Sequence, residues 1–273
     1  MAILQFKVKS ECLESKSDVV VILPTASVED MKKLRDYGFY QDGRKYQTLY
    51  LYHGTTGDSW DWLRFSRIES YAQDHMLAVV MPSVQNSSFH NIPGSYAYYD
   101  YVSREIPTIM NWTFPLSRKR ENTFIAGLSM GGNGVFKVAM ANPERFGAVA
   151  CLSGAFQLSQ KIEQDRACLH AAAYGHYEKL SGTIEDPYWH SSEVIRCGID
   201  YPKLYLCCGV DDDVCYKSNV DFKTHLDNIG MKYTYHEQHG GHDWDFWDDE
   251  IKRVLKWLPL KNDFVDEGEL PLR

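Results

Sequence analysis

The chain has 273 residues, of which 44% are hydrophobic and 24% are charged, so it can bury a core without disulfides. The net charge is −8, from 29 Lys and Arg against 37 Asp and Glu. No basic run is long enough to follow a phosphate backbone, which disfavours nucleic-acid and anionic-membrane partners. No Pro-, Ser- or Gly-rich linker divides the chain, which predicts a single domain over residues 1–273.

Targeting and cysteine patterns point to a reducing compartment. The first ten residues lack a basic stretch followed by an apolar segment, and no window approaches the roughly 18 apolar residues of a membrane span. The seven cysteines are an odd number without framework spacing, and none forms a zinc-type C-x-x-C pair. We therefore expect reduced thiols, a cytoplasmic location and no membrane partner.

Short apolar runs recur along the chain and are separated by segments of helical length. The expected strands are residues 19–23, 48–52, 77–80, 123–126, 148–152, 204–208 and 232–236. The expected helices are residues 59–74, 98–110, 132–142, 219–229 and 245–258. Runs that are apolar on both faces are typical of parallel strands covered by helices on each side. The alternation predicts an α/β fold whose mostly parallel central sheet is flanked by helices on both faces, with the first strands free to run antiparallel.

Residues 156–199 form a segment that is long for a crossover and rich in His, Tyr and Trp. We expect a small cap-like insertion here, with Tyr174 and Trp189 as candidates for lining a substrate pocket. The alternative is that these aromatic residues cover the sheet as ordinary amphipathic residues. The sequence supports both interpretations equally.

The most informative motif is Gly-Leu-Ser-Met-Gly at residues 127–131, which has the form G-x-S-x-G. It follows an apolar run and precedes a helical segment. A serine on such a sharp strand-to-helix turn adopts a strained backbone, and its neighbours two positions away must be very small. The turn exposes the hydroxyl and directs the next N–H toward the same space. The motif therefore predicts Ser129 as a nucleophile and Met130 N–H as one oxyanion donor.

A serine hydroxyl needs a base within hydrogen-bond reach, and the base needs a carboxylate to hold its tautomer. The α/β-hydrolase order of these groups is serine, acid, histidine. After Ser129 the chain presents three aspartates at 211–213 behind an expected strand, and then His239-Gly-Gly-His242 before an expected helix. We predict His242 as the base, with His239 as its rival and Trp244 packing beneath it. Spacing alone leaves the choice among the three aspartates open.

A metal site is the competing interpretation of the histidines at 236, 239 and 242. Three histidines at three-residue intervals on a Gly-containing loop do not share one face, and no carboxylate motif accompanies them. We therefore expect neither a metal ion nor an organic cofactor.

The second oxyanion donor is expected from the loop after an early strand. His53-Gly-Thr-Thr-Gly57 follows such a strand and is similar to an H-G-x-x-G oxyanion turn. We assign the donor to the N–H of Thr55, and we expect the His53 side chain to tie the loop to the sheet. Loss of one oxyanion donor typically costs about 3–4 kcal/mol of transition-state stabilisation.

Several motifs together resemble the putative esterase group of α/β-hydrolases. This group includes tributyrin esterases, esterase D or S-formylglutathione hydrolases, feruloyl and acetyl xylan esterases of carbohydrate esterase family one, and mycolyltransferases. The pieces that carry the resemblance are Leu-Tyr-His-Gly at 51–54, Gly-Leu-Ser-Met-Gly-Gly at 127–132, Asn-Pro-Glu-Arg-Phe at 142–146 and Gly-His-Asp-Trp at 241–244. The tributyrin-esterase branch is the most similar.

The resemblance implies a serine carboxylesterase with an α/β-hydrolase fold that acts on short-chain acyl or hydroxycinnamoyl esters, and it makes a homo-oligomer an expectation. The family's Gly-x-x-Asp pattern falls on Asp212 as the acid. Trp60 and His90 lie in matching pieces and are further pocket candidates, although a tyrosine is common in the family where His90 stands. Alternatives are a thioester hydrolase of the S-formylglutathione type, an acyltransferase, and a non-catalytic binding module on the same scaffold.

Overall fold

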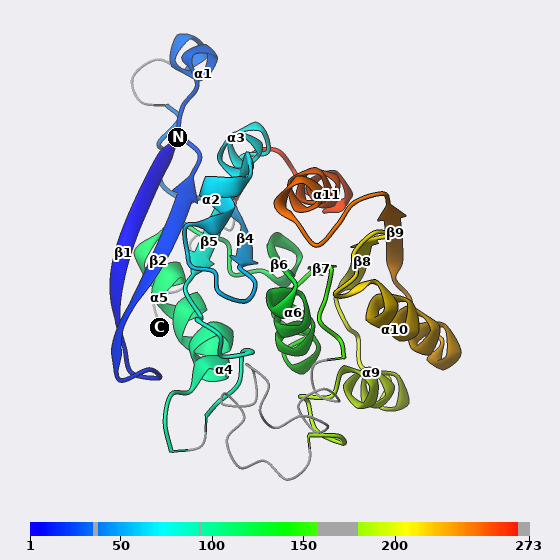
Figure 1. Cartoon of the computed structure of the whole chain (residues 1–273). Helices are drawn as coiled ribbons and strands as arrows, with labels where there is room; N and C mark the ends of the chain where they lie inside the picture. The colour runs from blue at the N-terminus through cyan, green and yellow to red at the C-terminus, as the bar shows by residue number, and fades with distance from the viewer. Residues whose placement is uncertain (35–37, 93, 158–179, 267–273) are drawn as a thin grey trace.

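A central sheet of eight strands organises the chain, in a computed structural model that describes residues 1–34, 38–92, 94–157 and 180–266 (Figure 1). The strand order is β1-β2-β5-β4-β6-β7-β8-β9. The strands are β1 (Ala2–Ser10), β2 (Ser15–Leu23), β4 (Gln47–Tyr52), β5 (Leu77–Pro82), β6 (Thr123–Leu128), β7 (Ala148–Leu152), β8 (Lys203–Gly209) and β9 (Thr234–Gln238). A separate antiparallel pair joins β3 (Arg44–Lys45) to β10 (Val265–Asp266).

The sheet is mostly parallel, as the sequence predicts. Strands β5, β4, β6, β7, β8 and β9 are joined by parallel pairings. Only β1 with β2 and β2 with β5 are antiparallel, at one end of the sheet. The register pairs Tyr52 with Gly127 and Gly209 with Gln238. The loops that carry the predicted site residues therefore leave neighbouring strands at the same edge of the sheet.

Helices cover both faces of the sheet (Figure 1). On one face, α5 (Ile106–Thr113), α6 (Met130–Ala141), α9 (Pro187–Arg196) and α10 (Tyr216–Ile229) pack into one buried cluster. On the other face, α2 (Asp61–Phe65), α3 (Ile68–Asp74) and α11 (Trp244–Trp257) pack into a second cluster. Alternate residues of β4 supply the two clusters, Tyr50 and Tyr52 to the first and Leu49 and Leu51 to the second. This alternation is why the strand reads as continuously apolar.

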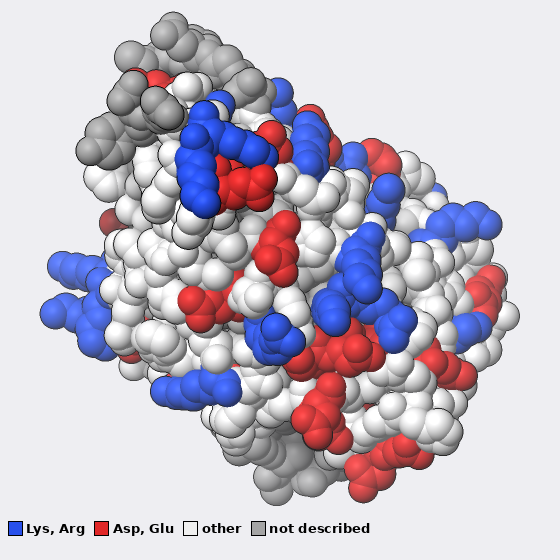
Figure 2. Space-filling model, turned by 90° about the horizontal axis from the view of Figure 1, so that it is seen from above, with Lys and Arg blue, Asp and Glu red and all other residues white. Residues whose placement is uncertain are grey.

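The remaining elements are short. They are α1 (Val28–Lys33), α4 (Tyr98–Asp100), a π-helical turn at Tyr101–Glu105 and a 3₁₀ turn at Arg120–Asn122. None of the described helices combines the length and apolar composition needed to cross a bilayer. On the face shown in Figure 2, the described basic and acidic side chains lie interspersed rather than sorted into one-sign areas.

Several described elements differ from the sequence-based expectation, and three of them are large enough to matter for the architecture. Strand β1 was not expected, because its apolar residues alternate with polar ones along an edge strand with one exposed side. The single helix expected at 59–74 is two helices, because Ser66 is extended with φ −138°. Helix α9 lies inside the expected cap, where Asp186 accepts the N–H groups of Tyr188 and Trp189 and Pro187 opens the helix. Residues 158–179 lie outside the described residues, so the cap itself stays a prediction.

Candidate active site

Ser129 stands on a tight turn between β6 and α6, with a φ of 54° that is unusual for a residue with a side chain. Neighbouring backbone leaves no space for side chains at the flanking glycines. A Cβ on Gly127 would lie 2.7 Å from the carbonyl oxygen of Gly131, and one on Gly131 would lie 2.5 Å from that of His53. The backbone is strained and tightly surrounded, which is typical of a nucleophile held in one orientation.

A continuous chain of hydrogen bonds links Ser129, His242 and Asp212. The Oγ of Ser129 lies 2.9 Å from Nε2 of His242, and Nδ1 of His242 lies 2.7 Å from Oδ2 of Asp212. The other oxygen of Asp212 accepts the N–H groups of Val214 and Cys215 at 3.0 and 2.7 Å. Burial raises the pKa of Asp212, but the hydrogen bonds from His242 and Cys215 N–H outweigh it and hold the pKa below its usual value. The carboxylate is therefore charged and positioned to orient the imidazole.

Trp247 packs against the His242 imidazole, whereas the sequence predicted Trp244 in this place. The Trp247 and His242 rings meet edge to face with centroids 5.0 Å apart, and Trp244 makes an edge-to-face contact with Trp247, at 5.3 Å. The indole N–H of Trp247 donates to Ser153 Oγ at 3.2 Å, which fixes the ring. Helix α11 begins at Trp244, so its first turn brings the residue three positions later under the histidine loop.

The turn after β4 lies directly against the nucleophile. A Cβ on Gly54 would lie 3.3 Å from the Cβ of Ser129, so the backbone at Gly54 is in close contact with the serine. Thr55 is the next residue of this segment. The N–H of Thr56 donates to Asn86 Oδ1 at 2.7 Å. Met130 is the first residue of α6, where an N–H has no partner within the helix. The two N–H groups assigned to the oxyanion thus belong to segments that meet at Ser129.

His53 ties this turn to the loop that follows β5, whereas the sequence predicted a tie to the sheet. Its Nε2 accepts the N–H of Val84 at 3.0 Å, so Nδ1 carries the proton and donates to the carbonyl of Gly54 at 2.7 Å. The ring is 1% exposed, and burial lowers its pKa, which keeps it neutral. A neutral ring can accept one bond and donate the other, and both bonds hold the turn in place.

A cavity of about 590 Å³ opens above Ser129 and His242. Aromatic and aliphatic side chains form much of its wall, and one charged pair, Asp61 and Arg64, lies on α2. Trp244, which the sequence predicted as a packing partner of His242, also lines the cavity. The lining residues that were not identified from the sequence are Asp61, Arg64, Phe65, Leu128, Val214 and Trp247. Phe65 is half exposed despite its size, and its ring lies 5.2 Å from that of Trp244. A large apolar residue shortly after the oxyanion turn was the available signal.

Three of the four predicted pocket residues are not among the described residues that line this cavity. Trp60 precedes α2 and packs on the cluster beneath α2 and α11. His90 is buried, with Nδ1 2.9 Å from Glu185 Oε1. Trp189 lies on α9 and is 38% exposed. None of these three is among the described residues that line the cavity, and Tyr174 lies outside the described residues.

The structure also separates the three aspartates and the three histidines. Asp211 pairs with His239 at 3.1 Å, and His236 pairs with Glu250 at 2.9 Å. The carboxyl, thiol and imidazole atoms of Asp212, Cys215 and His242 lie within 4.8 Å of one another, a spacing that a metal ion could bridge. Both ring nitrogens of His242 are already hydrogen-bonded to Ser129 and Asp212, so the serine–histidine–aspartate arrangement accounts for this cluster.

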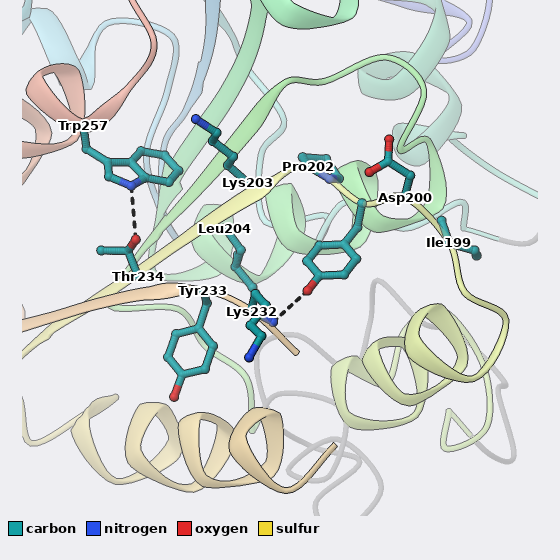
Figure 3. Close-up of a pocket in the computed structure, with 10 residues that line it drawn as sticks. Ile199, Asp200, Pro202, Lys203, Leu204, Lys232, Tyr233, Thr234 and Trp257 are labelled. Atoms are coloured by element: carbon teal, nitrogen blue, oxygen red, sulfur yellow. Dashed lines mark hydrogen bonds between the residues drawn. The ribbon is translucent and has the colours of Figure 1, made fainter. Parts of the chain in front are cut away.

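A second cavity of similar volume lies at the other end of β8, between the start of β9 and the end of α11 (Figure 3). The hydroxyl of Tyr201 accepts the N–H of Lys232 at 2.7 Å, and the indole of Trp257 donates to Thr234 at 3.1 Å. Its described lining residues include no serine, cysteine or histidine, so they form no serine–histidine or cysteine–histidine pair. The reactive groups lie at the carboxyl ends of the strands, as expected for an α/β sheet.

Comparisons with known proteins identify the family of the chain. Residues 13–258 match the putative esterase family. The acetyl esterase of Caldicellulosiruptor saccharolyticus is 31% identical over 272 residues, which is 96% of this chain and 100% of the relative.

Solved structures are similar over nearly the whole chain. The fluorophosphonate-binding serine hydrolase FphF of Staphylococcus aureus, with substrate bound, superposes with a TM-score of 0.84 at 32% identity, covering 94% of this chain and 98% of that one. S-formylglutathione hydrolase (FrmB) from the same organism has a TM-score of 0.82 at 32% identity, with the same coverage. A ferulic acid esterase at 20% identity, with a TM-score of 0.76, shares the fold. The chain therefore belongs to the putative esterase family and is a serine ester hydrolase with the α/β-hydrolase fold.

Proposed function

We propose that the protein is a carboxylesterase that hydrolyses short acyl esters through an acyl-enzyme formed on Ser129. The observation that carries this proposal is the chain of hydrogen bonds from Ser129 through His242 to Asp212, set at the floor of a cavity. A serine, a base and a charged carboxylate in this arrangement are the groups that nucleophilic acyl transfer requires.

The reaction uses groups of the chain alone. Ser129 Oγ attacks the ester carbonyl while His242 Nε2 takes the serine proton, and Asp212 stabilises the imidazolium. The N–H groups of Thr55 and Met130 bind the oxyanion of the tetrahedral intermediate. His242 then protonates the leaving alcohol, and the acyl group stays on Ser129. Water deprotonated by His242 attacks the acyl-enzyme and releases the acid.

The cavity offers an apolar side for an acyl group beside a polar side formed by Asp61 and Arg64. Phe65, Trp244 and Trp247 give it aromatic walls, and Leu128 and Val214 add aliphatic surface. The acetyl esterase relative supports acetyl and other short esters as the first substrates to test. The aromatic walls also suit a hydroxycinnamoyl group, so feruloyl esters are the second class within the same activity.

A thioester is the second candidate substrate. It is favoured by the relative named S-formylglutathione hydrolase, which covers the chain as fully as the serine hydrolase FphF does. The chemistry at Ser129 would be the same, because only the leaving group changes from an alkoxide to a thiolate.

The test is steady-state hydrolysis of p-nitrophenyl acetate, p-nitrophenyl butyrate, methyl ferulate and S-formylglutathione by the wild type and by Ser129→Ala. We expect the wild type to hydrolyse the acetyl ester and Ser129→Ala to lose roughly 10³-fold or more in kcat. A marked preference for the glutathione thioester would select the second candidate. Transfer of the acyl group to added alcohol in place of water would indicate an acyltransferase.

Labelling by a fluorophosphonate separates a wrong substrate from a wrong mechanism. An inert protein that still labels at Ser129 has an assembled site and another ester as substrate. A protein that neither hydrolyses the esters nor labels would be a binding module on the esterase scaffold, and the proposed function would be wrong.

A further inference from the structure

The loop that carries the acid and the loop that carries the base are joined by hydrogen bonds outside the proposed triad. Val210 N–H donates to the carbonyl of Gln238 at 2.9 Å, and Asp211 N–H donates to that of Gly240 at 3.1 Å. In return, Gly240 N–H donates to Oδ2 of Asp211 at 3.1 Å. Asp211 and Gly240 are therefore bonded in both directions, two residues before His242.

The two loops also touch directly. A Cβ on Gly209 would lie 2.0 Å from the carbonyl oxygen of Gly240, so only glycine allows this approach. Gly240 has a φ of +156°, and Gly241 follows it. Two consecutive glycines leave the histidine loop with little intrinsic stiffness, because glycine has more accessible backbone conformations than any other residue.

Oδ2 of Asp211 has a second partner, since Nδ1 of His239 lies 3.1 Å away. Hydrogen bonds from His239 and from Gly240 N–H lower the pKa of Asp211, so the carboxylate is charged at neutral pH. One oxygen thus holds the histidine loop at two successive residues. Asp211 is not among the residues that line the cavity over Ser129.

We propose that Asp211 is a positioning residue, whose carboxylate holds the Gly240–Gly241 segment so that His242 stays between Asp212 and Ser129. This inference rests on the proposed function, and it adds a role for a residue that touches neither substrate nor reacting atoms. Asp211 acts as a hydrogen-bond acceptor for the loop, and its charge is secondary.

Asp213 provides a matched control. It is an exposed aspartate on the other side of Asp212, and its carboxylate makes no hydrogen bond or ion pair within the described part of the chain. Replacing Asp213 changes the net charge near the site as much as replacing Asp211 does. A general electrostatic effect would therefore appear in both variants.

The experiment compares Asp211→Ala, Asp211→Asn, His239→Ala and Asp213→Ala in kcat, KM and the pH profile of kcat, on whichever ester the wild type hydrolyses best. We expect Asp211→Ala to lower kcat roughly 5–10-fold with KM within about twofold of wild type, because misplacement of a reacting group reduces the rate of the chemical step. Asp211→Asn keeps an oxygen acceptor for Gly240 N–H and should recover most of the loss. His239→Ala should lose less than Asp211→Ala, and Asp213→Ala should match wild type.

Two results would overturn the proposal. Asp211→Ala could behave like Asp213→Ala, which would make the contacts an inert surface pair. Alternatively, Asp211→Asn could lose as much as Asp211→Ala and shift the acidic limb of the pH profile, which would make the role electrostatic.

A measurement without turnover keeps the inference separate from the proposed function. NMR of the His242 Nδ1 proton, which is shared with Asp212, reports the position of the imidazole directly. We expect this signal to broaden or disappear in Asp211→Ala and to persist in Asp213→Ala. An unchanged signal in Asp211→Ala would overturn the positioning role even in a protein that hydrolyses no ester tested.

Discussion

Gly127 and Gly131 lie against each other across the turn that carries Ser129, so closely that a Cβ on Gly127 would sit 2.7 Å from the carbonyl oxygen of Gly131. The contact joins the end of strand β6 to the start of helix α6, and Ser129 lies between them with a positive φ. The same contact brings Gly131 against the backbone of His53, where the oxyanion turn begins.

Gly127→Ala should therefore damage the nucleophile more than the fold. The added methyl group would clash with backbone atoms of Gly131, and no side-chain rotation can relieve a clash with backbone. We therefore expect a loss of about 1–3 kcal/mol in the free energy of unfolding. Displacement of Ser129 should lower kcat roughly 10²-fold or more. Ala126→Gly, one residue earlier in β6, serves as the control, because it should lose stability while keeping kcat. Full activity in Gly127→Ala would contradict the inferred constraint.

Asp212→Asn tests which of the three aspartates is the acid. An asparagine amide cannot hold His242 in the required tautomer or stabilise the imidazolium, so kcat should fall roughly 10³–10⁴-fold with the fold intact. Asp213→Asn should leave kcat within about twofold of wild type. A large loss of kcat in Asp213→Asn and none in Asp212→Asn would show that Asp213 is the acid and would contradict the assignment to Asp212.

The buried ring of His190 should make the protein sensitive to mild acid. It lies on α9 against the Phe136 ring, and burial, followed by the Lys137 charge, lowers its pKa from 6.5 to about 4. Above pH 6.5 the ring is neutral in both states and contributes nothing to the pH dependence. As the pH falls from 6.5 to about 4, the unfolded chain binds a proton that the folded ring does not, so stability decreases.

His190→Phe should abolish this part of the acid sensitivity, which amounts to about 3 kcal/mol at the lower end of the window. Urea unfolding at about pH 7, 5.5 and 4.5 measures it in both proteins. The buried His53 titrates in both proteins, so the difference between them isolates His190. The same pH dependence of stability in the two proteins would show that folding does not lower the pKa of His190.

Lys137 and Glu185 form a buried ion pair that should matter for stability rather than for chemistry. Lys137 Nζ lies 2.8 Å from Glu185 Oε2 and also donates to the carbonyl of Ser88 at 3.1 Å. Glu185 also contacts His90, and all three side chains are less than 10% exposed. The ion pair links the nucleophile helix α6 to the segment that precedes α9 and to the loop after β5.

Lys137→Met and Glu185→Gln should each cost about 3–5 kcal/mol, because either leaves a buried charge or polar group without its partner. The double variant should cost clearly less than the sum of the two. Chemical unfolding of the four proteins gives the coupling, with kcat of the folded fraction as the control for the active site. Additive losses would mean that the two residues do not share one interaction.

The sequence was sufficient to predict the parallel core of the fold. All seven expected strands are present, and six of them are buried on both faces and therefore read as apolar runs. The seventh, β9, is a partly exposed edge strand that begins two residues later than expected. Ser129 could be recognised because its strained turn requires small residues at fixed spacing, a local constraint that is written in the sequence. Three elements could not be predicted in the same way: strand β1, the break between α2 and α3, and helix α9. Strand β1 depends on pairing at the edge of the sheet, and the helix boundaries depend on capping and on the local backbone conformation.

The acid and the cavity depend on tertiary structure. Three successive aspartates are equivalent in spacing, and the chain path from β8 brings Asp212 to His242 while Asp211 reaches His239 and Gly240. The cavity walls come from α2, from the start of α11 and from the acid loop. The sequence by itself determined the family, the nucleophile and the order of reactive groups, because these rest on local backbone requirements. Spacing left the acid open and only the family resemblance pointed to Asp212, whose contact with the base comes from the tertiary structure. Tertiary structure alone decided which side chains surround the substrate, because those contacts join segments distant in sequence through the packing of helices on the sheet.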